Sequence, residues 1–328
     1  MKGRGMTRPF EHNITAAGNS VCIRPAEPAD RSALLAMINE GDPFPFSDPA
    51  GRLNLYDDGI IWVAEADGMV VGTQSGGLKQ VRSGKTHALA SYDFHLRVKS
   101  DWRRCGVARA MTAHNNQWLY DKGARIRFSQ IAQDNKLTLR SRHMLGYREI
   151  ATITYLSLRR MSDVELDLSI PECELIFVNE SAEWQDRVLQ TFGKRDLSPT
   201  RLLDTIYATG VHGGYLGTMA TRSTGELAWG SLWDKHAAMA RSPLNPLDQT
   251  VFVHDIKAST AKAVRALAIG ALARLPTIGR LVLVLDNFFD VPSIVDLCSQ
   301  EFSVKTHIED LLLQLGTVHG RPYLDIRD

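Results

Sequence analysis

The segment Ser91-Tyr-Asp-Phe-His-Leu-Arg-Val98, followed by Arg103-Arg-Cys-Gly-Val-Ala108 and an amphipathic run to Lys122, decides the fold of this chain. The first piece is typical of a strand, the second of a tight basic turn and the third of a helix. An apolar stripe at helical spacing runs along the third piece and ends at Gly123; it consists of Val107, Ala110, Met111, His114, Trp118 and Leu119. Strand, basic turn and helix in this order predict a phosphate-binding site.

The turn has the properties of an anion site. A helix that begins near Gly106 leaves its first amides without intrahelical partners and points the positive end of its dipole at the turn. Gly106 lets the backbone come close to a ligand. Arg103, Arg104 and Arg109 add positive charge, so a pyrophosphate is the expected occupant.

The same residues resemble the central motif of the GCN5-related N-acetyltransferase (GNAT) superfamily. In that motif a strand ending in a hydrophobic-x-Val precedes Arg/Gln-x-x-Gly-x-Gly/Ala at the start of a helix. Here the matching residues are Leu96-Arg97-Val98 and Arg103 to Ala108. The resemblance implies an α/β (α+β) fold, with a mixed, mostly antiparallel sheet, flanking helices and a central V-shaped splay between two strands.

The order of elements in the family extends over about residues 21 to 160. The expected elements are a strand at 21–25, a helix at 30–38 with Asp30 as N-cap, a hairpin of strands 60–65 and 69–72, a strand at 126–131, a helix from 134 to 145 and a strand at 150–158. The glycine-rich segment 72–79 lacks the Lys-Ser/Thr of a phosphate loop, and we expect a strand with a bulge there.

The second half repeats this order. Strand-like segments at 173–178 and 281–287 follow those at 21–24 and at Asn135 by the same 152 positions. Between them, strands are expected at 215–220, 226–230 and 250–256, and a helix carries Ala261, Val264, Leu267, Ala268, Ala271 and Leu272 on one face. We therefore expect a flexible arm at 1–20, a GNAT domain at 21–160, a linker at 161–172 and a second GNAT-like domain at 173–328.

The second copy has Lys257-Ala-Ser-Thr-Ala-Lys262 where the first has Arg103 to Ala108. Without a glycine in the turn, a Cβ obstructs a pyrophosphate, while Ser259 and Thr260 can still cap the helix. We expect a degenerate copy that shapes the interface or the acceptor site.

Composition narrows the alternatives. A chain of 328 residues with 44% hydrophobic residues can bury two cores. The net charge of +1 argues against a nucleic-acid partner bound through bulk charge. No segment is long and apolar enough for a membrane span or a signal peptide, and the four separated cysteines indicate neither disulfides nor zinc, so we expect a cytoplasmic protein without a metal.

The resemblance implies acetyl-CoA as the acyl donor. The backbone around Leu96, Arg97 and Val98 would hold the acyl carbonyl and the pantetheine arm, and Asn135 would touch the end of the pantetheine. The pyrophosphate would lie on the turn and the helix start, which consist of Arg103, Arg104, Cys105, Gly106, Val107, Ala108 and Arg109.

Direct transfer to an amine needs a group that accepts a proton, and an acid can protonate the leaving thiolate. Candidates for the base are Tyr92, Asp93 and His95 on the strand that leads to the cofactor, with Glu65 as a further carboxylate. Strand alternation puts Asp93 and His95 on one face and Tyr92 on the other, unless a bulge intervenes. A polar pair at a domain interface is an equally good interpretation of Asp93 and His95.

The usual tyrosine acid of the family is absent. Its position holds Arg142, so another group supplies the proton or the thiolate leaves unprotonated. His143 and Ser141 are neighbours with suitable chemistry.

The loop at residues 39–49 lies where the family has a substrate-covering segment. Phe44 and Phe46 stand among three prolines and predict a stiff aromatic rim for the substrate. A loop that buries the two rings in its own core fits the sequence equally well.

Two classes of function follow. The favoured one is an acetyl-CoA-dependent N-acetyltransferase that acts by direct attack of a primary amine of a small molecule or peptide, with the N-terminal copy active and the protein a monomer or a homodimer. The alternative is a non-catalytic acyl-CoA-binding sensor or scaffold, which the missing tyrosine and the degenerate half would suit. A tandem enzyme resembling mycothiol synthase would share the chemistry of the first and differ in acceptor.

Overall fold

The fold was obtained as a computed structural model, which describes residues 12–16, 19–42, 44–161, 173–207, 214–222, 225–241, 249–275 and 278–325. The strands are β1 (His12–Ala16), β2 (Asn19–Pro25), β3 (Asp58–Ala66), β4 (Met69–Ser83), β5 (Thr86–Val98), β6 (Ile126–Ala132), β7 (Arg148–Arg160), β8 (Cys173–Ile176), β9 (Tyr215–Thr221), β10 (Ala228–Trp233), β11 (Thr250–Lys257), β12 (Arg280–Asp286) and β13 (Phe302–Leu315). The helices are α1 (Arg31–Ile38), α2 (Val107–Asp121), α3 (Lys136–Met144), α4 (Ala182–Thr191), α5 (Leu202–Ile206), α6 (Lys235–Ala238), α7 (Ala261–Arg274) and α8 (Val291–Cys298).

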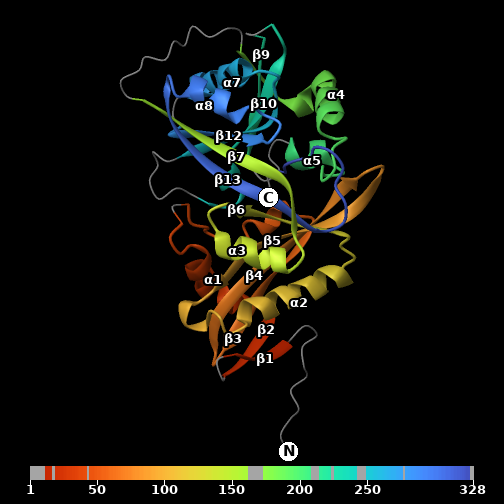
Figure 1. Cartoon of the computed structure of the whole chain (residues 1–328), viewed down its shortest axis with the longest axis vertical. Helices are drawn as coiled ribbons and strands as arrows, with labels where there is room; N and C mark the ends of the chain where they lie inside the picture. The colour runs from red at the N-terminus through yellow and green to blue at the C-terminus, as the bar shows by residue number, and fades with distance from the viewer. Residues whose placement is uncertain are drawn as a thin grey trace, which may run out of the picture.

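The strands of both halves form one continuous sheet in the order β1-β2-β3-β4-β5-β6-β13-β7-β12-β11-β10-β9-β8 (Figure 1). Among the strands of the described residues, β5 with β6 and β11 with β12 are the parallel pairs and the other neighbours are antiparallel, so the sheet is mixed and mostly antiparallel. The expected class of fold is confirmed. The sequence did not predict that the sheets of the two copies would merge.

The merger results from an exchange of final strands. Strand β13, at the end of the second copy, lies between β6 and β7, and β7 of the first copy pairs with β12. Tyr155 of β7 and His307 of β13 are direct partners, and their numbers differ by the same 152 positions that relate the two halves in the sequence. The exchanged strands therefore meet at the middle of a pseudo-symmetric arrangement.

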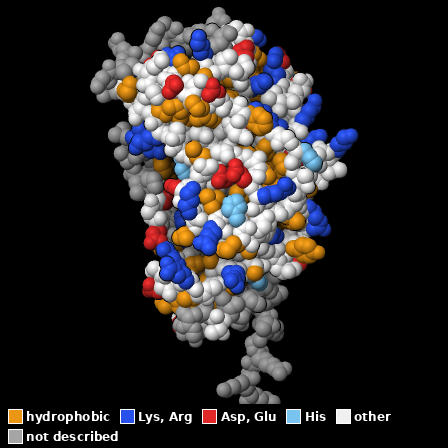
Figure 2. Space-filling view, in the orientation of Figure 1, with side chains coloured by type: hydrophobic (Ala, Val, Ile, Leu, Met, Phe, Trp, Pro, Cys, Tyr) orange, Lys and Arg blue, Asp and Glu red, His pale blue; other side chains and the backbone are white. Residues whose placement is uncertain are grey.

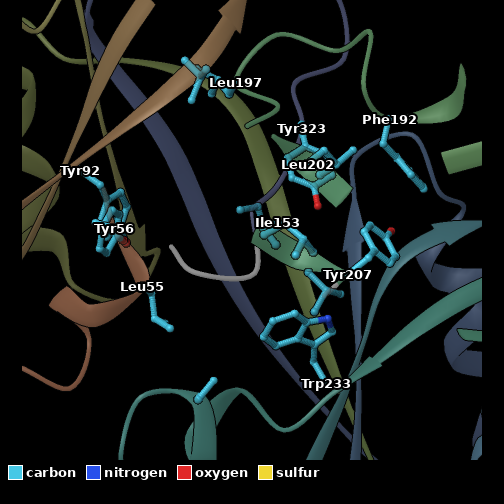
Figure 3. Close-up of a cluster of buried hydrophobic side chains, with 14 of the residues drawn as sticks. Leu55, Tyr56, Tyr92, Ile153, Phe192, Leu197, Leu202, Tyr207, Trp233 and Tyr323 are labelled. Carbon is cyan, nitrogen blue, oxygen red and sulfur yellow. The ribbon is translucent and has the colours of Figure 1, made fainter. Parts of the chain in front are cut away.

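Both faces of the sheet are covered, and successive side chains along a strand point to opposite faces. In β7, Leu156 and Leu158 point to one face and pack with α7 and α8, whereas Tyr155 points to the other face and packs against the cluster there. Figure 1 shows α2, α3, α7 and α8 on the near side of the sheet. A buried cluster on the opposite face joins the two halves; its members include Tyr56, Tyr92, Ile153, Tyr207, Trp233 and Tyr323 (Figure 3).

Two local expectations are corrected. Part of the arm expected at 1–20 is ordered structure, because His12–Ala16 pairs with β2, which begins at Asn19; residues 1–11 lie outside the described residues. Asp30 stands at the N-cap of α1 as expected, but its side chain makes no capping hydrogen bond. Its carboxylate instead accepts hydrogen bonds from the Glu27 amide, at 2.7 Å, and from Arg24, also at 2.7 Å.

The segment 72–79 lies within β4, so the expected strand is confirmed. The expected bulge is not in this segment: Thr73 pairs with Arg97 and Ser75 with Phe94, so the extra residue is on β5. The linker expected at 161–172 lies outside the described residues from 162 onward, and the division into two domains stays a prediction.

Candidate active site

The first copy contains the splay that the motif predicts. Parallel pairing joins Ala90–Tyr92 of β5 to Ile126–Phe128 of β6 and ends there. Farther along β5, His95 has a positive φ of 55°, and the register against β4 shifts. A bulge at this point bends β5 where it separates from β6.

The bulge breaks the alternation assumed from the sequence. Asp93 faces α2 and α3, and His95 makes edge contacts with Phe46 at 5.0 Å and Phe94 at 4.9 Å between ring centroids. Burial lowers the pKa of His95 well below its ordinary value, and the charges of Arg52, Arg241 and Arg97 act in the same direction. Asp93 and His95 therefore do not form the pair that a regular strand would give.

The basic turn begins a real helix. Gly106 is the N-cap of α2, with φ 88°, and nothing lies within 4 Å of the place where a Cβ would stand. Arg103 donates from Nε to the Val98 carbonyl at 3.0 Å, which ties the turn to the end of β5. The side chains of Arg103, Arg104 and Arg109 are exposed around this helix start. An open glycine, helix amides and exposed arginines fit a pyrophosphate.

The corresponding turn of the second copy already holds an anion from the chain itself. The Glu226 carboxylate accepts from the Ser259 amide at 3.0 Å and also from the Ser259 hydroxyl. Thr260 is the N-cap of α7 and accepts from the Ala263 amide at 3.2 Å, as expected of this residue.

The splay of the second copy is also filled, by residues near the C-terminus. Pairing of β11 with β12 ends at Val253 and Leu283. Beyond this point Tyr323 is buried and donates its hydroxyl to Asp255 at 3.0 Å, and Arg321 donates from Nη2 to Asp286 at 2.8 Å. Only about 20 Å³ of space remains between these groups. The two copies thus differ in the splay between their parallel strands as well as in the turn before the helix.

Asp93 is the centre of a buried network beneath the first splay. Its carboxylate accepts from Asn115 at 2.9 Å, from Tyr147 at 3.1 Å and from Arg142 at 3.3 Å. Burial raises the pKa of the Tyr147 hydroxyl, and the neighbouring Asp93 charge raises it further. Arg142, which stands at the position of the usual tyrosine acid, is thereby fixed in a buried ion pair.

Four other predicted site residues are placed as follows. Asn135 is the N-cap of α3 and accepts from the Thr138 amide at 3.2 Å. His143 is exposed in the last turn of α3, with Nδ1 3.1 Å from the Tyr147 carbonyl. Ser141 is exposed on the same helix. Glu65 accepts from Arg24 at 2.5 Å, which makes it part of an ion pair.

A cavity of about 880 Å³ lies between the two halves, on the face of the sheet opposite α2 and α3. Its floor consists of alternate residues of the exchanged strands: Tyr155, Ser157 and Arg159 from β7, and Ser303, Lys305, His307 and Glu309 from β13. Tyr92 of β5 and Gln130 of β6 line one end of it. Because Tyr92 is the last residue of β5 paired with β6, this end lies where the two strands separate.

The loop with the two phenylalanines supports the wall of this cavity. Phe44 is buried and stacks on His236, with ring centroids 4.0 Å apart, and Arg241 lies over the Phe46 ring at 4.5 Å. His236 and Arg241 both line the cavity. Phe44 and Phe46 therefore form a buried support behind the lining, packed against His236 and Arg241 of the second half and not within their own loop.

Glu309 carries a carboxylate into the cavity. His307 Nε2 lies 3.1 Å from Glu309 Oε1, and the Tyr155 hydroxyl donates to Gln130 at 3.2 Å beside them. Burial opposes ionisation of Glu309, but the hydrogen bond from His307 and the charge of Lys235 outweigh it and keep the pKa of Glu309 below its ordinary value. The same hydrogen bond raises the pKa of His307. This site can hold a cation or accept a proton.

Glu309, His307 and Tyr155 were missed at the sequence level. The available signal was the period-two pattern of Tyr155-Leu-Ser-Leu-Arg159, which indicates a strand with one polar and one apolar face. That pattern predicts an accessible face but does not say that β13 pairs beside it.

Comparisons with known proteins agree with this geometry. No protein-family model matches the sequence, and no curated protein matches it significantly. Several solved structures, however, are similar to the structure of this chain. A GCN5-related N-acetyltransferase from Sphaerobacter thermophilus has a TM-score of 0.56 at 15% identity, and the match covers 94% of this chain and 98% of that chain. Another, from Kribbella flavida, has a TM-score of 0.50 at 11% identity, with 90% and 71% covered.

A third similar structure is the glucosamine N-acetyltransferase region of a fungal multi-domain β-N-acetylglucosaminidase. Its TM-score is 0.62 at 11% identity, and the match covers 90% of this chain and 38% of that chain. The chain thus has the fold of the GCN5-related N-acetyltransferases.

In the described part of the chain, no helix is long and apolar enough to cross a membrane. The described residues also contain no group of three or more His, Cys, Asp or Glu placed to hold a metal ion.

Proposed function

We propose that this protein is an acetyl-CoA-dependent N-acetyltransferase whose donor site is the N-terminal splay and whose acceptor enters from the cavity between the halves. One observation carries the proposal. The open turn at Gly106 begins α2 on one face of the sheet, and the cavity meets the splay from the other face at Tyr92 and Gln130. A donor and an acceptor can therefore approach the same gap from opposite sides.

The chain provides groups for each part of the transfer. Acetyl-CoA supplies a thioester carbonyl, to which the amine nitrogen bonds as the carbon–sulfur bond breaks. CoA leaves as a thiolate, and this thiolate takes up the second proton that the nitrogen loses when the amide forms. The α2 start would hold the pyrophosphate. Backbone amides of β5 beyond Tyr92, where pairing with β6 has ended, can donate to the oxygen on which negative charge develops. Glu309, directly or through water, can accept the proton that the ammonium must lose.

The substitution Gly106→Trp tests the proposed acetyl-CoA site. A tryptophan there must adopt a positive φ and would fill the open space in front of the helix amides, so acetyl-CoA has to give up several charge-assisted hydrogen bonds. Each is worth about 1.5–3 kcal/mol. We expect affinity to fall at least about 100-fold and turnover with a panel of primary amines, followed as free thiol release, to disappear.

Gly123→Trp is the matched control. Gly123 also has a positive φ, of 87°, and nothing lies within 4 Å of its missing Cβ, but it stands at the other end of α2. It should therefore incur the same backbone strain and leave donor affinity within about twofold. Equal loss of acetyl-CoA binding in both variants would contradict the proposed site. Binding of acetyl-CoA by the parent protein with no turnover of any amine would favour the alternative of a sensor or scaffold.

A further inference from the structure

The carboxylate of Glu309 lies beside a histidine that can take a proton from it. Glu309 and His307 are two residues apart on β13, and both side chains line the cavity between the halves. His307 Nε2 lies 3.1 Å from Glu309 Oε1. The side chain of His307 is 51% exposed and that of Glu309 is 23% exposed. The pair therefore leads from the more enclosed part of the cavity toward solvent.

The exchange of strands places this pair next to the splay of the first copy. Glu309 is the direct partner of Ala132 on β6, which lies farther along that strand than Phe128, where pairing with β5 ends. His307 is the direct partner of Tyr155 on β7, and the centroids of their rings are 5.9 Å apart. Because β13 is the last strand of the second half, that half supplies an acid–base pair to the first.

The pair and the proposed donor site lie on opposite sides of the sheet. Helices α2 and α3 are on the side shown in Figure 2, where basic, acidic and hydrophobic side chains are interspersed. Glu309 and His307 line the cavity on the other face. A donor bound at the start of α2 would therefore leave the imidazole of His307 open to solvent.

The surroundings favour a negative Glu309 and a positive His307. The hydrogen bond to Glu309 raises the pKa of His307 against the effect of burial, and the charges of Glu309 and Asp134 raise it further. Burial opposes ionisation of Glu309, but the groups around it keep its pKa below the ordinary value. Besides Glu309, the titratable or charged groups on the elements around His307 are Asp134 after β6, Tyr155 and Arg159 on β7, Lys235 and His236 on α6, and Lys305 on β13.

The proton affinities of the two side chains differ in the direction that a transfer requires. An ordinary glutamate has a pKa of about 4.3 and an ordinary histidine about 6.5, so the imidazole holds a proton about 100-fold more strongly. The shifts at this site widen the difference, because the pKa of Glu309 is lowered and that of His307 is raised. A proton that reaches Glu309 therefore moves on to a neutral His307.

We propose that His307 is a relay that takes the proton from Glu309 and releases it to solvent, so that Glu309 is ionised again for the next acceptor. This inference rests on the proposed function, in which an ammonium gives its proton to Glu309 directly or through water. The O–H bond of the Glu309 carboxyl then breaks as an N–H bond forms at Nε2 of His307. The imidazolium loses a proton to water, and no further reactant is needed.

Two substitutions separate a relay from a group that only positions Glu309. His307→Ala should lower kcat at least about tenfold with the best acceptor from a panel that includes glucosamine, spermidine and glycinamide, and leave the acetyl-CoA KM unchanged. Added imidazole should restore part of this kcat, because the site is half exposed. His307→Gln keeps a hydrogen-bond donor for Glu309 but cannot hold the proton, so it should be as slow as His307→Ala. Parental kcat in His307→Gln would overturn the relay.

The pH profile and a matched control make this test specific. The kcat of the parent should fall as the pH is lowered through the raised pKa of His307, because an imidazolium cannot take a second proton. This fall should be absent in His307→Gln, and its persistence would overturn the inference. His87→Gln is the control, because His87 is also exposed on a strand but pairs with Arg82, away from the splay. It should keep the parental kcat and pH profile.

A titration of the His307 imidazole by nuclear magnetic resonance tests the pair without acetyl transfer. Its signal is assigned by its loss in His307→Gln. The pKa of His307 should fall in Glu309→Gln, because the charge that raises it is removed. An unchanged pKa would overturn the inference and leave the function standing. A coupled pair in a parent protein that acetylates no amine would reject the function, and the relay with it.

Discussion

Glu309→Gln is expected to lower kcat for acetyl transfer by about 10²-fold or more, in the range that general acid–base groups contribute. Glutamine preserves the size of the side chain but removes the charge that faces the cavity. An ammonium would then have neither an anion to hold it nor an acceptor for its proton, while the donor site at Gly106 would be unaffected.

The pH profile distinguishes a proton acceptor from a structural group. The parent enzyme can use an amine that arrives protonated, because Glu309 has a lowered pKa and stays ionised through neutral pH. In the variant only amine that is already neutral can react. Its rate should therefore rise about tenfold per pH unit up to the pKa of the acceptor. A variant with parental kcat and an unchanged pH profile would remove Glu309 from the mechanism.

Lys79→Ala is expected to destabilise the protein by about 3–5 kcal/mol, because it leaves the partner carboxylate buried without its cation. Lys79 of β4 forms an ion pair with Asp325 at 3.0 Å, and both side chains are at most 1% exposed. This pair ties the first half to the same C-terminal segment that fills the second splay. Urea unfolding followed by circular dichroism measures the loss.

Two controls make this stability prediction specific. The double variant Lys79→Met/Asp325→Leu removes both charges and should regain most of the stability that either single change loses. Lys122→Ala breaks the Lys122–Asp58 pair, of similar length but about half exposed, and should cost less than about 1 kcal/mol. Equal effects of Lys79→Ala and Lys122→Ala would show that burial of the first pair does not matter.

Local sequence signals predicted most of the elements. The strand, turn and helix from Ser91 to Lys122 could be predicted because glycine at a positive φ and an apolar stripe act over a few residues. The bulge at His95 could not be placed, since it depends on how β4 pairs with β5.

The acceptor cavity depends on contacts that are remote in sequence. Its floor exists because β13 inserts between β6 and β7, and nothing in the alternation at Tyr155–Arg159 specifies which strand lies beside it. The filling of the second splay by Tyr323 also depends on a contact that is remote in sequence, because the C-terminal segment must fold back for the Tyr323 hydroxyl to reach Asp255. By contrast, the missing glycine in the turn at 257–262 already indicated that the second copy differs.

Calorimetric titration of acetyl-CoA into the parent protein measures how many of the two copies bind the donor. We expect one equivalent per chain, lost in Gly106→Trp and retained in Glu226→Gln, which alters only the turn of the second copy. Two equivalents, or a single equivalent that Gly106→Trp leaves intact, would contradict the assignment of the donor site, and no binding at all would contradict the proposed function.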